Sequence, residues 1–207
     1  MQSDNSVKQI RTIVTAKETS CYRIVTDDPD NWHLVASRPI AQGELVTPRG
    51  STFYVDVCGV EFVDVILEET QEKRRVYTAI SAVPSDAGCA PSALEIPWCF
   101  MNHSCMPNTH DGWSAETPAD FQYAENGATR DIAEGEELTY DYALEQYDYG
   151  AQFACRCGVE SCRGTISGFK GLSSEEQEQL LLRASPYIQE KFRHDSVQEY
   201  VDISPLG

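Results

Sequence analysis

The sequence predicts a β-rich α+β fold with a helical extension at its C-terminus. Short runs of Val, Ile, Phe and Tyr recur through most of the chain, and clusters of Gly, Pro, Asp and Asn separate them as turns separate strands. After Gly171 the pattern changes to helix-start signals followed by apolar residues. Hydrophobic residues make up 41% of the 207-residue chain, which is enough to bury a core and argues against global disorder.

Most of the predicted strands are short and lie between turn signals. They cover residues 9–15, 22–25, 33–36, 43–46, 76–80, 121–124, 129–132 and 137–140. Residues 53–67 are predicted to form paired strands broken at Cys58-Gly59, and residues 26–31 a turn. The charged run 68–75 is predicted to be a solvated helical turn or loop. Residues 84–97 contain three prolines and are expected to form an irregular connection.

Two helices are predicted after residue 171. Ser173 and Glu176 form a capping-box pattern, in which each side chain accepts from the other residue's backbone N–H. Ser185 followed by Pro186 predicts a second helix, with serine at the cap and proline at the first helical position. The expected apolar side chains are Leu180, Leu181, Leu182, Tyr187, Ile188 and Phe192. We expect this extension to pack on the strand-rich body as a structural brace.

The net charge of −17 bears on the choice of partners. A strongly negative surface repels phosphate backbones, so no direct nucleic-acid binding is expected. It favours encounter with basic proteins or peptides, although charge of this size also serves solubility alone. The chain has no apolar run long enough to span a membrane and no signal-peptide pattern at its N-terminus. We therefore expect a soluble intracellular monomer, in the cytoplasm or the nucleus.

A polar stretch directly follows an apolar run near the middle of the chain. Residues 102–108 place an asparagine, a histidine, a hydroxyl and a thiol behind the apolar residues 96–101. Polar groups at the end of a buried run need partners, because unpaired they destabilise the fold. The stretch is therefore predicted either to cap a strand or to hold a ligand.

Three cysteines lie close together near residue 160, in the spacing Cys155-x-Cys157-x4-Cys162. In a reducing compartment cysteines do not serve as disulfides, whereas thiolates are preferred ligands of structural zinc. A tetrahedral site needs a fourth ligand, and Cys105 in the polar stretch is the best candidate. The alternative is three ordinary loop cysteines.

Several motifs occur in a fixed order. They are Asn102-His103-Ser104-Cys105-x-Pro107-Asn108, Gly135-Glu136-Glu137-Leu138-Thr139-Tyr140-Asp141-Tyr142 and Cys155-x-Cys157-x4-Cys162-Arg163-Gly164. Together with the upstream segment 32–44, this set resembles a SET-domain lysine methyltransferase with a post-SET zinc segment and no pre-SET segment. The resemblance divides the chain into an arm (1–21), a SET domain (22–152), a post-SET segment (153–168) and the helical extension (169–207).

The resemblance implies a SET-domain fold of small curved β-sheets with a knot-like crossing. The cofactor would be S-adenosylmethionine, with a lysine entering a narrow channel from the opposite face. Trp32, His33, Asn102 and His103 would contact the cofactor. Tyr142 would be the catalytic tyrosine, and Tyr140 would occupy the position that tunes the number of methyl groups. Cys105, Cys155, Cys157 and Cys162 would hold one structural zinc ion.

These residue types suit the chemistry that the resemblance implies. A lysine amine must be neutral before it attacks a methyl group, and a dry channel lowers its pKa. A tyrosine hydroxyl can hold the amine in line. Free tyrosine titrates near 10, so Tyr142 is expected to orient the amine rather than deprotonate it. A second hydroxyl at Tyr140 would crowd the channel, which predicts mono- or dimethylation.

One segment departs from the family pattern. Most members carry Gly-x-Gly around the tryptophan, where the backbone approaches the cofactor, but this chain has Asn31-Trp32-His33. Two alternatives to protein-lysine methylation follow from this change. The chain could be a SET-fold enzyme acting on a small molecule, or a non-catalytic SET-fold binding module.

Overall fold

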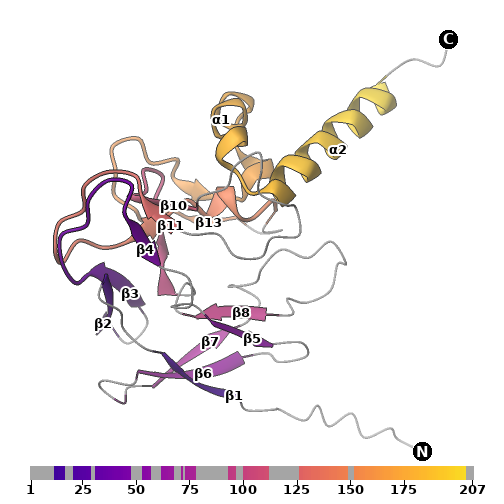
Figure 1. Cartoon of the computed structure of the whole chain (residues 1–207). Coiled ribbons are helices and arrows are strands. Elements are labelled where there is room, and N and C mark those ends of the chain that lie inside the picture. Colours follow the sequence, from indigo (N-terminus) through magenta and orange to yellow (C-terminus); the bar gives the residue numbers. More distant parts are fainter. Residues whose placement is uncertain are drawn as a thin grey trace, which may run out of the picture.

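A computed structural model of the chain (Figure 1) describes residues 12–16, 21–28, 31–47, 53–56, 62–67, 71, 73–77, 93–96, 100–111, 126–148 and 152–203. The described strands form small sheets rather than one continuous sheet. Strands β1, β5, β6, β7 and β8 lie at one end of the molecule, and helices α1 and α2 lie at the other. Strands β10, β11 and β13 lie between these two ends.

Three of the sheets lie in the first half of the chain. β1 (Thr12–Ala16) runs parallel to β6 (Phe62–Leu67), which also pairs antiparallel with β7 (Lys73–Tyr77). The other two are antiparallel pairs, β2 (Tyr22–Asp28) with β3 (Asn31–Ala36), and β5 (Phe53–Asp56) with β8 (Ala93–Ile96).

The remaining sheets gather the middle and the end of the chain. β11 (Asn126–Ala128) lies between β4 (Leu45–Thr47) and β10 (Thr109–Asp111). β9 (Asn102–His103) pairs in parallel with β12 (Thr139–Tyr140), and β13 (Phe153–Ala154) forms a hairpin with β14 (Thr165–Ile166).

The main core lies beneath β2 and β3. In β2, Tyr22 and Ile24 are buried while Arg23 between them is exposed, as alternation along a strand requires. The other buried side chains of this cluster are Cys21, Trp32, Leu34, Ala36, Ile40, Val46, Val65, Phe100, Met101, Ala128, Ile132 and Leu138. Segments from both halves of the chain thus share one core.

The C-terminal helices begin where the sequence predicts. Before α1 (Ser174–Leu180), Ser173 Oγ accepts from the Glu176 N–H at 3.3 Å, and Glu176 Oε2 accepts from the Ser173 N–H at 2.8 Å. Before α2 (Pro186–Ile203), Ser185 Oγ accepts from the Ile188 N–H at 3.4 Å. Local capping chemistry therefore sets both helix starts.

A second apolar cluster holds these helices against the rest of the chain. Its buried members are Leu144, Tyr147, Phe169, Ala184 and Ile188. Leu144 and Tyr147 come from the segment after the tyrosine motif, so the extension packs on that segment, whereas packing on the strands was expected. None of the helices in the described part of the chain combines the length and apolar character that a membrane crossing needs.

Some strand predictions were wrong. β5 and β6 do not pair with each other across residues 58–59, because β5 pairs with β8 and β6 lies between β1 and β7. Part of the charged run 68–75 is strand, since β7 begins at Lys73. β2 continues to Asp28 into the predicted turn, with a register shift between Val25 and Asp28. Strand partners are non-local, so turn signals cannot assign them. The strand predicted at 121–124 lies outside the described residues.

Candidate functional site

The site is built on the parallel pairing of β9 with β12. Asn102 lies opposite Thr139 and His103 opposite Tyr140, and the Ser104 N–H donates to the Tyr140 carbonyl at 3.0 Å. This pairing brings together two of the three motifs found in the sequence. Parallel neighbours need a long connection, and here it spans the 35 residues between β9 and β12.

Asn108 fixes the approach of these two segments. Its side chain is buried, and its Oδ1 accepts from the Thr139 N–H at 2.9 Å. Its Nδ2 donates to the Glu137 carbonyl at 2.8 Å and to Glu136 Oε1 at 3.0 Å. One buried amide therefore satisfies several polar groups of the segment that leads into β12.

The two motif tyrosines lie side by side after this pairing. The Tyr140 and Tyr142 ring centroids are 4.8 Å apart, with planes inclined at 46°. The Tyr142 hydroxyl donates to the Met101 carbonyl at 2.9 Å, which ties the end of the tyrosine motif to the residue before β9. Asp141, between the tyrosines, caps the short 3-10 helix η3 (Tyr142–Leu144) by accepting from the Ala143 N–H at 3.0 Å.

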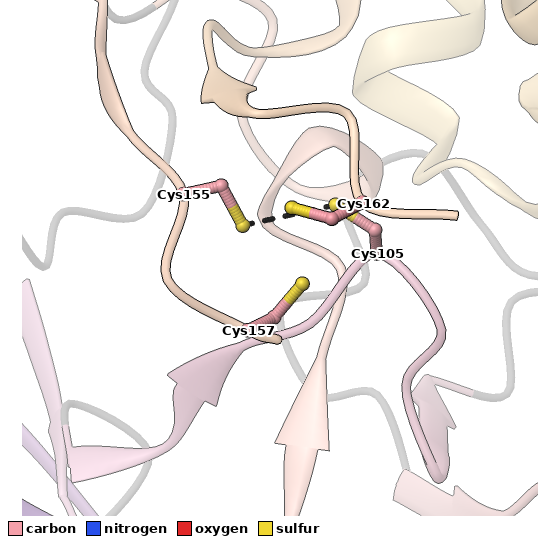
Figure 2. Close-up of side chains that lie close together, drawn as sticks. All are labelled: Cys105, Cys155, Cys157 and Cys162. Carbon is pink, nitrogen blue, oxygen red and sulfur yellow. Dashed lines mark hydrogen bonds between the residues drawn. The ribbon is translucent and has the colours of Figure 1, made fainter. Parts of the chain in front are cut away.

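The four predicted cysteine ligands meet beside this segment (Figure 2). The sulfur atoms of Cys105, Cys155, Cys157 and Cys162 all lie within 4.8 Å of one another, and those of Cys105 and Cys155 are 3.8 Å apart. A zinc ion bound by four thiolates at about 2.3 Å has sulfur–sulfur edges of about 3.8 Å. The donor set thus fits a tetrahedral zinc ion in both atom type and spacing.

The thiol acidities also favour a bound cation. Burial raises the pKa of Cys105 and raises that of Cys155 to about 12. Burial acts on Cys157 as well, but the backbone N–H groups of Cys105 and Val159 outweigh it and lower the pKa of that thiol to about 6. Four clustered thiols cannot all ionise at neutral pH without positive charge, which a divalent metal would supply.

His103 connects the cysteines to the tyrosines through its ring. Its Nδ1 accepts from the Tyr142 N–H at 3.2 Å, and its Nε2 lies 3.3 Å from Cys105 Sγ. Since Nδ1 is an acceptor, the ring proton lies on Nε2 and points at the sulfur. Burial lowers the pKa of His103 to about 4, so the ring is neutral at physiological pH.

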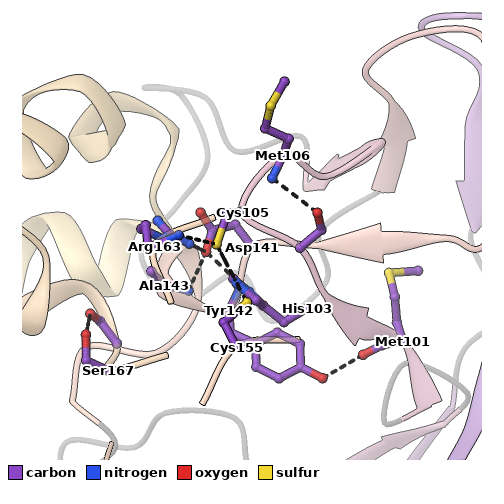
Figure 3. Close-up of polar contacts among 12 residues, drawn as sticks. Met101, His103, Cys105, Met106, Asp141, Tyr142, Ala143, Cys155, Arg163 and Ser167 are labelled. Atoms are coloured by element: carbon purple, nitrogen blue, oxygen red, sulfur yellow. Dashed lines mark hydrogen bonds and ion pairs between the residues drawn. The ribbon is translucent and has the colours of Figure 1, made fainter. Parts of the chain in front are cut away.

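Arg163 makes a second connection, which sequence reasoning missed (Figure 3). Its Nη2 donates to Asp141 Oδ1 at 2.6 Å, and its backbone N–H donates to Cys105 Sγ at 3.4 Å. In the sequence, Asp141 and Arg163 are each only part of a motif. The nearest signal was an arginine directly after the last cysteine of a metal-type spacing.

The protein family of the chain follows from its match to a family model. A family model described as "SET domain" matches residues 31–143, which is more than half of the chain. The chain belongs to the SET-domain family. The predicted family and the β-rich SET fold are both confirmed.

This chain is similar to histone-lysine methyltransferases. It is 41% identical over 70 residues to the histone-lysine N-methyltransferase ash1 of Drosophila melanogaster, covering 33% of this chain and 3% of the relative. It is 25% identical over 158 residues to the histone-lysine N-methyltransferase SETD2 of Homo sapiens, covering 73% of this chain and 6% of the relative. The chain therefore spans a small part of the length of these relatives.

Two solved structures are also similar to this chain. The methyltransferase domain of human SETMAR is 18% identical, with a TM-score of 0.38 and coverage of 71% of this chain and 58% of that one. KRYPTONITE in complex with mCHG DNA and SAH is 21% identical, with a TM-score of 0.39 and coverage of 75% and 35%.

Within the SET domain, β3 is hydrogen-bonded to the residues just before β12. The Leu138 N–H donates to the Leu34 carbonyl at 2.8 Å, and Val35 bridges to Glu137, so β3 lies along the segment that enters β12. The Trp32 ring is buried in the core, with its centroid 5.3 Å from that of Phe100.

The other two predicted cofactor residues, His33 and Asn102, lie on β3 and β9. His33 is buried in β3, and Asn102 Nδ2 donates to Glu137 Oε1 at 2.7 Å. A small hollow lies beside Tyr140 and Asp141, and Arg183 of the C-terminal extension lines it from another side. The extension thus borders the site as well as bracing it.

Proposed function

We propose that this chain is an S-adenosylmethionine-dependent protein-lysine N-methyltransferase. The observation that carries the proposal is the convergence, in a SET-family chain, of His103 and Tyr140 on paired strands with the Tyr142 hydroxyl fixed beside them. The similarity of this chain to histone-lysine methyltransferases supports the same reaction class.

The cofactor would supply an activated methyl group on a sulfonium sulfur. Trp32, His33, Asn102 and His103 are the residues proposed to hold it. The half-buried Asn102 amide and its Glu137 partner offer polar groups that suit the amino-acid tail or the nucleoside of this cofactor. Both ring nitrogens of His103 already have partners within the protein, so we propose that its contact to the cofactor is made by its backbone.

Tyr142 is proposed to orient the substrate amine. Its proton is given to the Met101 carbonyl, so its oxygen lone pairs remain able to accept an N–H from a lysine. The amine loses its proton to solvent before reaction, since a dry, buried channel disfavours the charged form. With the cofactor bound, the nitrogen of this neutral amine would accept the activated methyl group. Tyr140, whose ring contacts Tyr142, is proposed to limit the reaction to one or two methyl groups.

The four clustered cysteines are proposed to bind one structural zinc ion. The support is the spacing of their sulfur atoms and the need of this thiol set for positive charge. Cys105 comes from the loop after β9, and the other three come from the segment around the β13–β14 hairpin. Zinc would therefore fasten this segment to the site.

The proposed substrate is a basic, lysine-containing protein or peptide. A net charge of −17 favours encounter with such a partner. The relatives are described as histone-lysine methyltransferases, so basic histone-tail peptides are the first substrates to test. A small-molecule substrate and a non-catalytic binding role are the alternatives, because Asn31-Trp32-His33 replaces Gly-x-Gly.

Calorimetric titration with S-adenosylmethionine is the first experiment. We expect saturable binding, whereas no binding at millimolar concentration would remove the methyltransferase proposal. Peptide methylation then tests the role of Tyr142. We expect Tyr142→Phe to lower kcat by about 10- to 100-fold, because one oriented hydrogen bond is lost. Tyr147→Phe is the matched control, since that hydroxyl bonds to Asp195 away from the motif tyrosines. Full activity in Tyr142→Phe would refute the assigned role.

A further inference from the structure

We propose that Arg163 is a positioning residue that makes the geometry of the catalytic tyrosine segment depend on the folded cysteine cluster. This inference rests on the proposed function and concerns how the same site is controlled. It assigns to Arg163 a role distinct from metal binding and from contact with the reacting atoms.

The first half of the link is an ion pair that is almost fully buried. Arg163 Nη2 lies 2.6 Å from Asp141 Oδ1, with side-chain exposures of 15% for the arginine and 3% for the aspartate. A carboxylate this deeply buried needs a charged partner or several donors. Asp141 has the guanidinium of Arg163 and the N–H of Ala143 on the same oxygen.

The second half of the link fixes Arg163 to the cysteine cluster. Arg163 directly follows Cys162, and its own N–H donates to Cys105 Sγ at 3.4 Å. The next residue, Gly164, has a φ of +75° and donates its N–H to Cys162 Sγ at 3.3 Å, while its carbonyl accepts from the Cys155 N–H at 2.9 Å. The position of the Arg163 backbone is therefore set by the cluster.

The effect on the tyrosines follows from the place of Asp141. It lies between Tyr140 and Tyr142, and its carboxylate caps the 3-10 helix that begins at Tyr142. Without Arg163, that carboxylate would turn towards water and release the cap. Tyr142 would then lose the backbone orientation that directs its hydroxyl to the Met101 carbonyl. His103 supplies a parallel connection, because its ring lies between Cys105 Sγ and the Tyr142 N–H.

A purely structural role for Arg163 would have a different signature. It would lower thermal stability and leave kcat of the folded, zinc-loaded protein unchanged. A positioning role lowers kcat while zinc content and cofactor affinity stay close to those of the wild type. The experiment therefore needs zinc content, cofactor affinity, kcat and a local probe of the tyrosine segment in the same variants.

The variants are Arg163→Gln and Asp141→Asn, with Arg156→Gln as the matched control. Arg156 is an exposed arginine between two of the cluster cysteines. For Arg163→Gln we expect about one zinc per chain, a Kd for S-adenosylmethionine within about 3-fold of wild type, and kcat at least about 10-fold lower. The kcat of the double variant should be no lower than that of the more impaired single variant, because both substitutions break the same Arg163–Asp141 ion pair. Arg156→Gln should match wild type.

The local probe is hydrogen exchange of individual amides, measured by NMR on the zinc-loaded protein. The Tyr142 and Ala143 N–H groups donate to His103 Nδ1 and Asp141 Oδ1, so they report directly on the link. We expect their exchange to rise about 10-fold or more in Arg163→Gln, and also in wild type after zinc is chelated. Chelation should add little to the exchange of these amides in the variant.

Wild-type exchange and wild-type kcat in zinc-loaded Arg163→Gln would overturn the proposal. If that variant loses zinc or does not fold, Asp141→Asn decides in its place. Asp141→Asn keeps an oxygen for the Ala143 cap but removes the charge. Wild-type amide exchange together with wild-type kcat in this variant would also overturn the proposal. If the wild-type protein neither binds S-adenosylmethionine nor transfers methyl groups, the proposed function fails. The exchange measurements still test the link in that case.

Discussion

The docking of the C-terminal extension depends on Ile188, and Ile188→Ala tests this directly. Ile188 lies on α2 and is fully buried between the extension and the segment that follows the tyrosines. The same interface includes a backbone hydrogen bond of 2.9 Å from the Ser185 N–H to the Leu144 carbonyl. Truncating Ile188 should loosen α2 from Leu144, two residues after Tyr142.

The size of the effect follows from the atoms removed. Ile→Ala deletes three carbons, and at about 0.8 kcal/mol for each buried methylene this loses about 2.4 kcal/mol. An unfilled cavity adds to this, so we expect a loss of about 3 kcal/mol. If the whole chain unfolds as one unit, the melting temperature should fall by about 6–12 °C.

Limited proteolysis is the more local assay. Trypsin can cut α2 after Lys191 or Arg193 only when the helix opens, so the cleavage rate follows the opened population. A loss of 3 kcal/mol should raise that rate on the order of 100-fold. The control is Leu182→Ala, because Leu182 is 83% exposed and its truncation should change stability by less than about 0.5 kcal/mol.

A cleavage rate within about 3-fold of wild type, together with an unchanged melting temperature, would refute this reasoning. It would mean that the second apolar cluster does not hold α2 in solution. A large change in cleavage rate or melting temperature in Leu182→Ala would also refute the reasoning, because it would mean that the exposed Leu182 side chain has a packing partner.

Three further predictions concern the metal, a helix cap and a buried amide. Removing zinc with a chelator at neutral pH should lower the melting temperature and make the cluster thiols reactive, which a thiol reagent measures; equal reactivity before and after would contradict a metal site. Ser173→Ala should cost about 1 kcal/mol at neutral pH in urea unfolding. The Ser173 hydrogen bonds lower the pKa of Glu176, so this stabilisation should be lost as pH falls below about 4.5, and a pH-independent difference would contradict it. Asn108→Ala should cost about 3 kcal/mol because several buried partners lose their bonds, whereas a loss under about 1 kcal/mol would mean that water replaces the amide.

The helix starts could be predicted from the sequence because they depend on residues that are close together in the chain. The cap at Ser173 depends on Glu176 three positions away, and Ser185-Pro186 sets the start of α2 by itself. The cysteine cluster was predictable for a chemical reason instead. Three thiols in a tight spacing require a fourth, and Cys105 lay in a polar loop.

The features that sequence missed depend on contacts between distant segments. The partner of β5 is β8, and the charged residues of β7 gave no sign that they form the third strand of the β1–β6 sheet. The Arg163–Asp141 pair joins residues 22 positions apart in an irregular region, where no periodicity marks neighbours. The role of Asp141 as cap and ion-pair partner is visible only when both contacts are in place.

The separation of Cys105 from the other cysteines sets an order of events during synthesis. Cys155 is made 50 residues after Cys105, and at about 5–20 residues per second this gap lasts about 3–10 seconds. β12 ends at Tyr140, 15 residues before Cys155, so for about 1–3 seconds of that interval β9 and β12 can pair while the thiol of Cys105 has none of its partners from the hairpin segment. A nascent chain would therefore acquire the paired strands before it can close the cluster. Metal supply or oxidation at that moment would decide how much newly made protein matures.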